Sequence, residues 1–279
     1  MSPEKHLLDW QKSQTIAETI SPLLGQLYRQ KGVEVLLFGK TLVNAATIDI
    51  IKTHRLARRY TGTPLSPEQT LPLIKALSEM ELSPCRIDVG QLAHEFWQGR
   101  DDEHGVKDFL HTSLLGAMNG QTVSEPRDVV LYGFGRIGRL LTRLLVEKNG
   151  PGYPLRLRAV VVRGGKKGDL EKRASLLRRD SVHGQFNGSI IVDEERKAII
   201  ANGNYIQFIY ANKPEEVDYT SFGINNALIV DNTGVWRDAD GLSQHLACKG
   251  AEKVLLTAPG KGDIKNVVFG VNESVIKPE

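Results

Sequence analysis

The apolar residues follow one spacing in the first half of the chain and another in the second. Over residues 7–115 they recur at helical spacing, which is typical of amphipathic helices. From Val129 onward they gather in short runs typical of strands. We therefore predict an all-helical domain over residues 1–125 and an α/β domain over residues 126–279. The polar, proline-containing segment 119–128 is the predicted linker.

Caps and prolines divide the helical half. Ser66-Pro67-Glu68-Gln69 places a serine cap before a proline and a glutamine, which predicts a helix start. Asp88 repeats the cap pattern before another apolar run. Ser21-Pro22 predicts a break in the first helix. Residues 33–60 are interpreted as one long helix because of their length, although the β-branched start VEVLLF also fits a strand.

The second half opens with a strand, a glycine turn and a helix. The apolar run Val129–Tyr132 is followed by Gly133, Gly135 and Gly138 in a G-x-G-x-x-G spacing. Such glycines allow a tight turn, close approach of a pyrophosphate, and close helix–strand packing. The helix N-terminus then faces the phosphates, and its N–H groups stabilise an anion. One apolar face of that helix is expected to pack on the sheet, made of Ile137, Leu140, Leu141, Leu144 and Leu145.

Further strands and one helix complete an α/β Rossmann-type NAD(P)-binding domain. Strands are predicted at Leu155–Val162, Ile190–Val192, Ala198–Ile200, Tyr205–Tyr210, Ala227–Asp231, Lys253–Thr257 and Val267–Asn272. A helix is predicted over Asp238–Lys249. Ligands of open α/β sheets bind at the carboxyl ends of the strands, so the cofactor site is expected there.

Composition narrows the possible partners. The 279 residues carry a formal net charge of only +3, so we expect no nucleic acid partner. No apolar run is long enough to cross a bilayer and the N-terminus has no hydrophobic signal core, so a cytoplasmic protein without a membrane partner is expected. Cys85 and Cys248 are the two cysteines, too few and too far apart for a disulfide framework or metal cluster.

Five segments of the second half resemble the glyceraldehyde-3-phosphate dehydrogenase family and follow the family's order. They are YGFGRIGR at 132–139, RRDSVHGQFNG at 178–188, VDNTGVW at 230–236, KVLLTAPGKG at 253–262 and VVFGVN at 267–272. The resemblance spans just over half the chain and implies the NAD(P)-binding half of an oxidoreductase of glycolysis. It implies a dinucleotide as partner, and a homo-oligomer for the full enzyme.

The resemblance also assigns the cofactor contacts. Asn232-Thr233-Gly234 resembles the family's loop beside the nicotinamide ribose, and Thr257 begins the segment that lines the nicotinamide side. The predicted cofactor-binding residues are Gly133, Phe134, Gly135, Arg136, Ile137, Gly138, Arg163, Thr233, Gly234 and Thr257.

The adenosine side departs from the usual pattern, which leaves the choice between NAD and NADP open. A dinucleotide fold commonly ends its second strand with a carboxylate that holds the ribose hydroxyls. This chain has Arg163 there, with Lys166 and Lys167 close behind, and Asn212 where the family often has an arginine near the adenine. Cations attract a 2′-phosphate. A solvated basic loop, with backbone contacts alone to the adenosine, is equally compatible with the sequence.

The catalytic residues of the family are not found in the sequence. In the family, a cysteine thiolate in an S-C-T-T-N segment attacks the aldehyde after activation by a histidine. Neither Cys85 nor Cys248 matches that segment, which we expect to follow residue 279. No catalytic residue and no metal site is therefore predicted in this chain. Two function classes remain: the cofactor-binding part of a phosphorylating aldehyde dehydrogenase, or a non-catalytic NAD(P)-binding regulatory or interaction protein.

Overall fold

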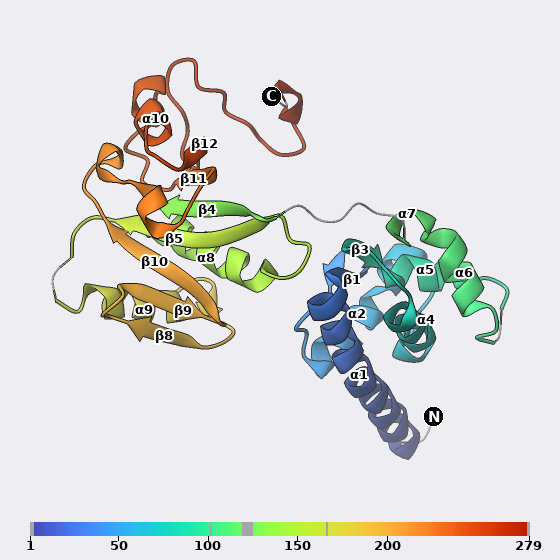
Figure 1. The fold of residues 1–279 in the computed structure, drawn as a ribbon. Coiled ribbons are helices and arrows are strands. Elements are labelled where there is room, and N and C mark those ends of the chain that lie inside the picture. The colour runs from blue at the N-terminus through green and yellow to red at the C-terminus, as the bar shows by residue number, and fades with distance from the viewer. Residues whose placement is uncertain (1–2, 101, 119–124, 166, 278–279) are drawn as a thin grey trace. The chain divides into compact units, whose positions relative to one another are not determined.

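The computed structural model describes residues 3–100, 102–118, 125–165 and 167–277. The chain divides into two compact units, Met1–Ser124 with Gly150–Tyr153, and Glu125–Asn149 with Pro154–Glu279 (Figure 1). Residues 119–124 of the predicted linker lie outside the described residues, and its last two residues, Arg127 and Asp128, already belong to a strand.

The first unit combines helices with a small sheet. Its elements are α1 (Pro3–Lys31), β1 (Val33–Leu37), β2 (Lys40–Thr41), α2 (Thr47–Leu56), α3 (Arg58–Thr61), α4 (Pro67–Glu79), β3 (Cys85–Asp88), α5 (Val89–Phe96), α6 (Val106–Ser113) and α7 (Leu115–Met118).

The prediction of an all-helical first domain is wrong, because this unit contains a three-stranded sheet in the order β2-β1-β3. Strand β1 pairs parallel with β3, with Val33 opposite Cys85, and antiparallel with β2. The long helix predicted over residues 33–60 is replaced by two strands and two short helices. Phe38 and Gly39 adopt φ values of 48° and 77°, which a helix does not allow, so the chain turns there.

The two predicted helix starts are confirmed, whereas the predicted helix break is wrong. Ser66 and Gln69 form a reciprocal capping box at α4, and Asp88 accepts hydrogen bonds from Gly90 N and Gln91 N at α5, so both predicted starts are confirmed. The break predicted at Ser21-Pro22 is wrong, since α1 continues through Pro22. Packing on the rest of the unit holds this helix: Ala17, Ile20, Leu24 and Leu27 are buried in one apolar core.

The second unit is the predicted α/β domain. Its elements are β4 (Arg127–Tyr132), α8 (Arg136–Lys148), β5 (Leu155–Val162), α9 (Asp169–Arg178), β6 (Arg179–Asp180), β7 (Gly184–Gln185), β8 (Ile190–Asp193), β9 (Ala198–Ala201), β10 (Asn204–Tyr210), η1 (Pro214–Glu216), η2 (Tyr219–Phe222), β11 (Ala227–Asp231), α10 (Ala239–Leu246), β12 (Ala251–Leu256) and η3 (Glu273–Val275).

A seven-stranded sheet in the order β12-β11-β4-β5-β10-β9-β8 organises this unit (Figure 1). The first five strands of that order run parallel, and β9 and β8 are antiparallel additions at one edge. A mostly parallel sheet with helices between its strands is the Rossmann-type arrangement. The strands predicted at Leu155–Val162 and Ala227–Asp231 are confirmed to the residue. The strand predicted at Val267–Asn272 is wrong, because these residues form turns and irregular backbone.

Each face of the sheet carries its own apolar core, because successive strand residues point to opposite faces. Val129 and Leu131 face the core shared with α8 and α9. Val130 and Tyr132 face the other core, which includes Cys248 just beyond α10. The predicted apolar face of α8 is partly wrong. Ile137 and Leu144 are 48% and 49% exposed, whereas the buried positions of the helix are Gly138, Thr142 and Val146.

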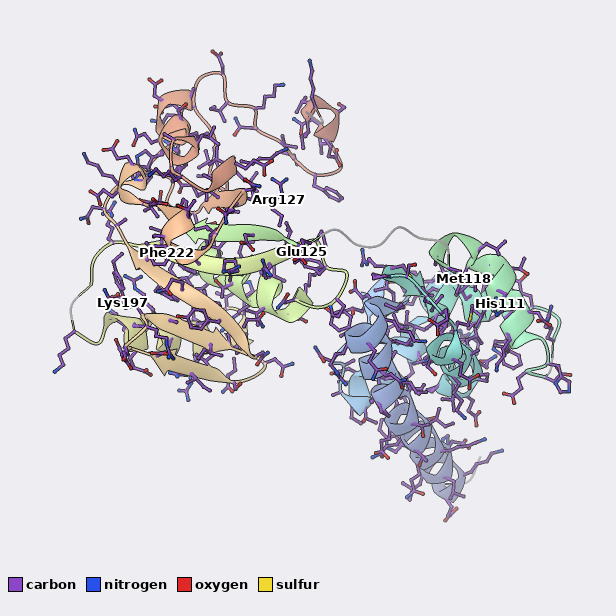
Figure 2. All side chains as sticks on the ribbon, viewed as in Figure 1. His111, Met118, Glu125, Arg127, Lys197 and Phe222 are labelled. Atoms are coloured by element: carbon purple, nitrogen blue, oxygen red, sulfur yellow. The ribbon has the colours of Figure 1, made fainter. Side chains whose placement is uncertain are left out.

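Ion pairs lie at the amino ends of the central strands, opposite the end where the cofactor is predicted to bind. Arg127, at the start of β4 (Figure 2), has its guanidinium 3.0 Å from a carboxylate oxygen of Glu252. The buried carboxylate of Asp128 pairs with Arg156 at 2.8 Å and with Arg158 at 3.3 Å. These partners compensate the burial of a charge next to the strand core.

Candidate cofactor-binding site

A pocket of about 400 Å³ opens at the carboxyl ends of the central parallel strands, where open α/β sheets bind ligands. Its walls come from the ends of β4, β5 and β11, from the loops that follow them and β10, and from Arg173 of α9. The lining residues are Tyr132, Gly133, Phe134, Gly135, Val161, Val162, Arg163, Arg173, Ala211, Asn212, Asn232, Thr233, Val235 and Trp236.

The three glycines of the turn meet different surroundings. Gly133 has a φ of 98°, and a Cβ there would lie 2.8 Å from Thr233 Cγ2. A Cβ at Gly138 would lie 2.3 Å from the carbonyl oxygen of Gly133, so α8 can approach the turn only because residue 138 is glycine. A Cβ at Gly135 would meet no atom of the described residues within 4 Å, apart from its chain neighbours, and would project into open space.

The open space at Gly135 lies in front of a helix N-terminus. Gly135 is the N-cap of α8, so no N-cap side chain accepts from the first N–H groups of that helix. These groups and the helix dipole favour an anion at this point. A glycine whose absent side chain leaves room beside free N–H groups fits the pyrophosphate of a dinucleotide, so the residues present fit the predicted cofactor.

The loop after β11 forms the facing wall. Asp231 Oδ1 accepts two hydrogen bonds from Thr233, from its backbone N at 2.6 Å and its Oγ1 at 2.7 Å. Thr233 Oγ1 accepts in turn from Val235 N at 3.2 Å. Thr257 Oγ1 donates at 3.1 Å to the carbonyl of Asp231, which ties β12 to the same loop. Gly234 has a φ of 65°, so the loop turns there.

A buried polar pair supports this loop from behind. His245 Nε2 lies 3.1 Å from Asp231 Oδ2, and both side chains are fully buried. The imidazole of His245 packs edge-on against the rings of Tyr132 and Trp236, with centroid distances of 4.7 and 5.6 Å. Burial, followed by the charge of Asp231, raises the pKa of the Tyr132 hydroxyl well above its usual range, so this group stays protonated.

Cations line the pocket where the adenosine is predicted to lie. Arg163 follows β5, is exposed, and has no carboxylate partner among the described residues. Arg173 also lines the pocket, and its Nε donates to Asp169 Oδ2 at 2.6 Å. Tyr210 donates to the same oxygen at 3.4 Å, so Asp169 is committed to this network. Lys167 is exposed, and Lys166 lies outside the described residues.

The structure gathers some of the predicted site residues into the pocket and leaves others around it. Gly133, Phe134, Gly135, Arg163 and Thr233 line the pocket. Gly138 lies against the turn, and Gly234 and Thr257 belong to the supporting loops. Arg136 and Ile137 are exposed in the first turn of α8. The contact of each with a cofactor stays a prediction.

Sequence reasoning missed several lining residues. Tyr132 and Val162 end the predicted strands, and their position at the carboxyl end was a usable signal. Trp236 follows closely after the predicted nicotinamide loop, so its place in the pocket could have been predicted. Arg173 carried no such signal, because it enters the pocket from α9. The same holds for the contact between Asp231 and His245, which joins a strand end to the following helix.

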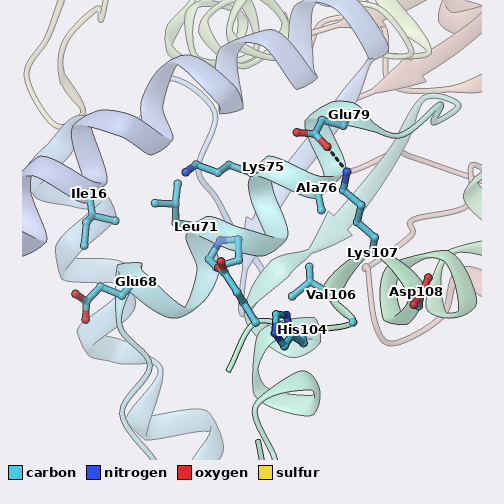
Figure 3. A pocket seen from close by; sticks show the side chains of 13 residues that line it. Ile16, Glu68, Leu71, Lys75, Ala76, Glu79, His104, Val106, Lys107 and Asp108 are labelled. Atoms are coloured by element: carbon cyan, nitrogen blue, oxygen red, sulfur yellow. Dashed lines mark ion pairs between the residues drawn. The ribbon is translucent and has the colours of Figure 1, made fainter. Parts of the chain in front are cut away.

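A larger groove of about 750 Å³ lies in the first unit, between α4, the start of α6 and Ile16 of α1 (Figure 3). Apolar residues such as Leu71 and Val106 line it together with charges of both signs, including an ion pair of 2.6 Å between Lys107 and Glu79. Its glycine at a helix start, Gly105 before α6, does not follow a strand, so the groove lacks the strand, glycine turn and helix of the dinucleotide site. Across the described residues, no group of three or more His, Cys, Asp or Glu could hold a metal ion. Nor does any helix in that part of the chain have the length and apolar character to cross a membrane.

Comparison with known proteins places this geometry in a family. Residues 127–239 match the family model described as glyceraldehyde 3-phosphate dehydrogenase, NAD binding domain. A glyceraldehyde-3-phosphate dehydrogenase-like protein of Pseudomonas aeruginosa is 52% identical over 260 residues, which are 91% of this chain and 56% of that protein. Because 260 residues cannot fit within the second unit, this match extends into the first.

Enzymes named glyceraldehyde-3-phosphate dehydrogenase match more narrowly. That of Thermotoga maritima is 35% identical over 151 residues, or 54% of this chain and 42% of that enzyme. That of Streptococcus pyogenes is 33% identical over 148 residues, or 53% and 40%. The chain thus spans about half the length of the curated relatives it matches. Its second unit belongs to the glyceraldehyde-3-phosphate dehydrogenase family as the family's NAD(P)-binding portion.

Proposed function

We propose that this chain supplies the cofactor-binding part of a dehydrogenase that oxidises an aldehyde, as its family relatives named for glyceraldehyde 3-phosphate suggest. The observation that carries the proposal is the open position beside Gly135, in front of the N-terminus of α8. That arrangement suits a pyrophosphate, and the bound dinucleotide would supply the acceptor for a hydride.

In this proposal the residues of this chain bind the dinucleotide and orient it. The N–H groups at the start of α8 hold the negative charge of the pyrophosphate. The loop of Asn232 and Thr233 forms the facing wall and limits where the nicotinamide end can lie. Val161, Val235 and Trp236 give the pocket apolar surface.

Neither cysteine is among the residues that line this pocket. The thiol of Cys248 is buried, donates to the carbonyl of Pro214 at 3.0 Å, and has its pKa raised to about 11 by burial. Cys85 belongs to β3 in the first unit, and burial raises its pKa as well. A nucleophilic cysteine needs the thiolate form. We therefore assign cofactor binding to this chain and the attacking thiolate to another segment of the enzyme.

We further propose that NADP binds at least comparably to NAD. Arg163 stands at the end of β5, where a ribose-binding carboxylate is usual, and no carboxylate among the described residues neutralises it. A guanidinium forms a charge-assisted contact with a 2′-phosphate.

Two measurements on one preparation test the proposal. Isothermal calorimetry should show that NAD and NADP bind, and an absorbance assay with glyceraldehyde 3-phosphate should show no reduction of the cofactor. Absence of binding would contradict the cofactor role. Measurable turnover by the pure chain would contradict the assignment of the thiolate to another segment.

Binding without turnover would also fit a regulatory NAD(P)-binding protein. The coding DNA beyond codon 279 separates the two functions. A reading frame that continues into a segment of the S-C-T-T-N type supports the dehydrogenase, whereas an immediate stop codon supports the regulatory protein.

A further inference from the structure

A continuous series of contacts joins a buried histidine to the glycine turn. His245 of α10 contacts Asp231 Oδ2 at 3.1 Å. Asp231 Oδ1 accepts from the backbone N and the hydroxyl of Thr233. The methyl group of Thr233 then packs so closely on Gly133 that a Cβ there would lie 2.8 Å away. Three segments of the fold are thereby linked across the pocket.

The surroundings of this pair indicate which nitrogen of the imidazole donates to the carboxylate. An ionised carboxylate only accepts hydrogen bonds, so the 3.1 Å contact with Asp231 Oδ2 is donated by the Nε2 of His245. The Nδ1 of His245 is buried and has no hydrogen-bond partner among the described residues. A proton on Nδ1 would be a buried donor without a partner, so the tautomer with its proton on Nε2 fits this geometry. Tyr132 and Trp236 hold the ring in that orientation.

Removal of the Nε2 donor would leave half of a buried carboxylate without a partner. A buried charge that loses its hydrogen bond is costly, and the cost falls when the group turns or admits water. Asp231 cannot turn without releasing Thr233, because its other oxygen holds that residue by two hydrogen bonds. The loop that forms one wall of the pocket would therefore lose its fixed position.

We propose that His245, acting through Asp231, is a positioning residue of the cofactor pocket, which holds the Thr233 loop against the glycine turn for a nicotinamide dinucleotide. The inference rests on the proposed function of the pocket. His245 does not line the pocket, so its effect on the cofactor must pass through the residues that it contacts, which are Asp231, Tyr132 and Trp236.

The test compares His245→Leu with His245→Gln. Leucine removes the donor at similar volume, whereas the amide of glutamine can still donate to Asp231. Titration of NAD, followed by the fluorescence of Trp236, the tryptophan that lines the pocket, should give an affinity about tenfold weaker for His245→Leu. His245→Gln should stay within about threefold of the wild type.

His54 supplies a matched control in the first unit. It is equally buried, at 1% exposure, and its Nε2 lies 2.8 Å from Thr70 Oγ1. His54→Leu should lower the melting temperature and leave the affinity for NAD unchanged. If His245→Leu does not fold, His245→Asn replaces it, because the asparagine amide is too short to reach Asp231 while the glutamine amide is not.

The outcomes separate this inference from the proposed function. Wild-type affinity in a folded His245→Leu variant overturns the positioning role alone. A loss of affinity in His54→Leu equal to that in His245→Leu overturns it too, since any buried histidine would then have the same effect. If the wild-type protein binds neither NAD nor NADP, the proposed function fails and the inference fails with it.

Discussion

Gly138 and Gly133 approach each other so closely that a Cβ at residue 138 would lie 2.3 Å from the carbonyl oxygen of residue 133. The neighbour is backbone, so it cannot move aside without shifting the turn. We expect Gly138→Ala to lower the free energy of unfolding by about 1–3 kcal/mol, which exceeds the gain in helix propensity. Urea unfolding followed by circular dichroism measures it.

Gly135→Ala is the matched control for that prediction, because its Cβ would meet no atom of the described residues within 4 Å apart from its chain neighbours. Its stability should stay within about 0.5 kcal/mol of the wild type. Equal destabilisation by the two alanines would mean that the close contact at Gly138 does not govern the packing of α8.

Arg163 tests the cofactor preference. Arg163→Asp should reduce the affinity for NADP by about tenfold or more, because a carboxylate repels the 2′-phosphate and can accept from the ribose hydroxyls of NAD. The preference of the wild type for NADP should shrink as salt rises, since the loop is exposed. Calorimetry with both cofactors at two salt concentrations gives the ratio of the affinities for NADP and NAD. Lys40→Asp, an exchange at an exposed cation of the first unit, controls for net charge.

An unchanged ratio in Arg163→Asp, together with a strong NAD preference in the wild type, would show that the basic loop makes no contact with the phosphate.

The buried imidazole of His54 should make the folded protein less stable in mild acid. Burial lowers its pKa to about 4, although the carbonyl of Ile50 opposes the shift. The unfolded chain takes up a proton near pH 6.5 and the folded protein only near pH 4, so the contribution of this group is complete above pH 6.5 and falls as the pH drops to 4. The total loss is about 3 kcal/mol at most. Urea unfolding at pH 7 and pH 5 measures how the free energy of unfolding changes with pH.

His54→Leu should be less stable at pH 7 but should lose less stability between pH 7 and pH 5. Parallel slopes for the variant and the wild type would mean that other groups cause the acid sensitivity.

The cysteines should differ in reactivity. Cys248 is 6% exposed and has a pKa of about 11, so only about one molecule in a thousand carries its thiolate at pH 8. Cys85 is only partly buried, although burial raises its pKa as well. A disulfide reagent at pH 8 should label Cys85 first. The variants Cys85→Ser and Cys248→Ser show which cysteine gives the fast phase of labelling and which gives the slow phase. Faster labelling of Cys248 would contradict the thiol environment described here.

The second unit was predictable because its signals are local. The apolar run at Leu155–Val162 and the turn at Gly133 each carry their meaning within a few residues, and both were predicted correctly. The first unit was not, since β1 pairs with β3, which lies about fifty residues further along the chain. VEVLLF fits either a short strand or the start of a helix, and only its distant partner decides between them.

The pocket shows the same division. The glycines and Thr233 follow from motifs, whereas Arg173 and His245 enter from helices whose placement no motif encodes. Val267–Asn272 failed for a related reason: an apolar run predicts a strand, yet a strand needs a neighbour with which to pair. In the structure these residues are unpaired with the sheet, and Phe269 is 93% exposed.

The central claim is that the open space beside Gly135 receives the pyrophosphate of a nicotinamide dinucleotide. Its φ of −71° is accessible to any residue, so Gly135→Val should fold normally while its side chain fills that space. Calorimetry should show NAD binding by the wild type and by Gly116→Val, whose glycine also has open surroundings. For Gly135→Val, binding should fall by about a hundredfold or more. Wild-type affinity in a folded Gly135→Val variant would contradict the account, because the glycine turn would then be a turn and nothing else.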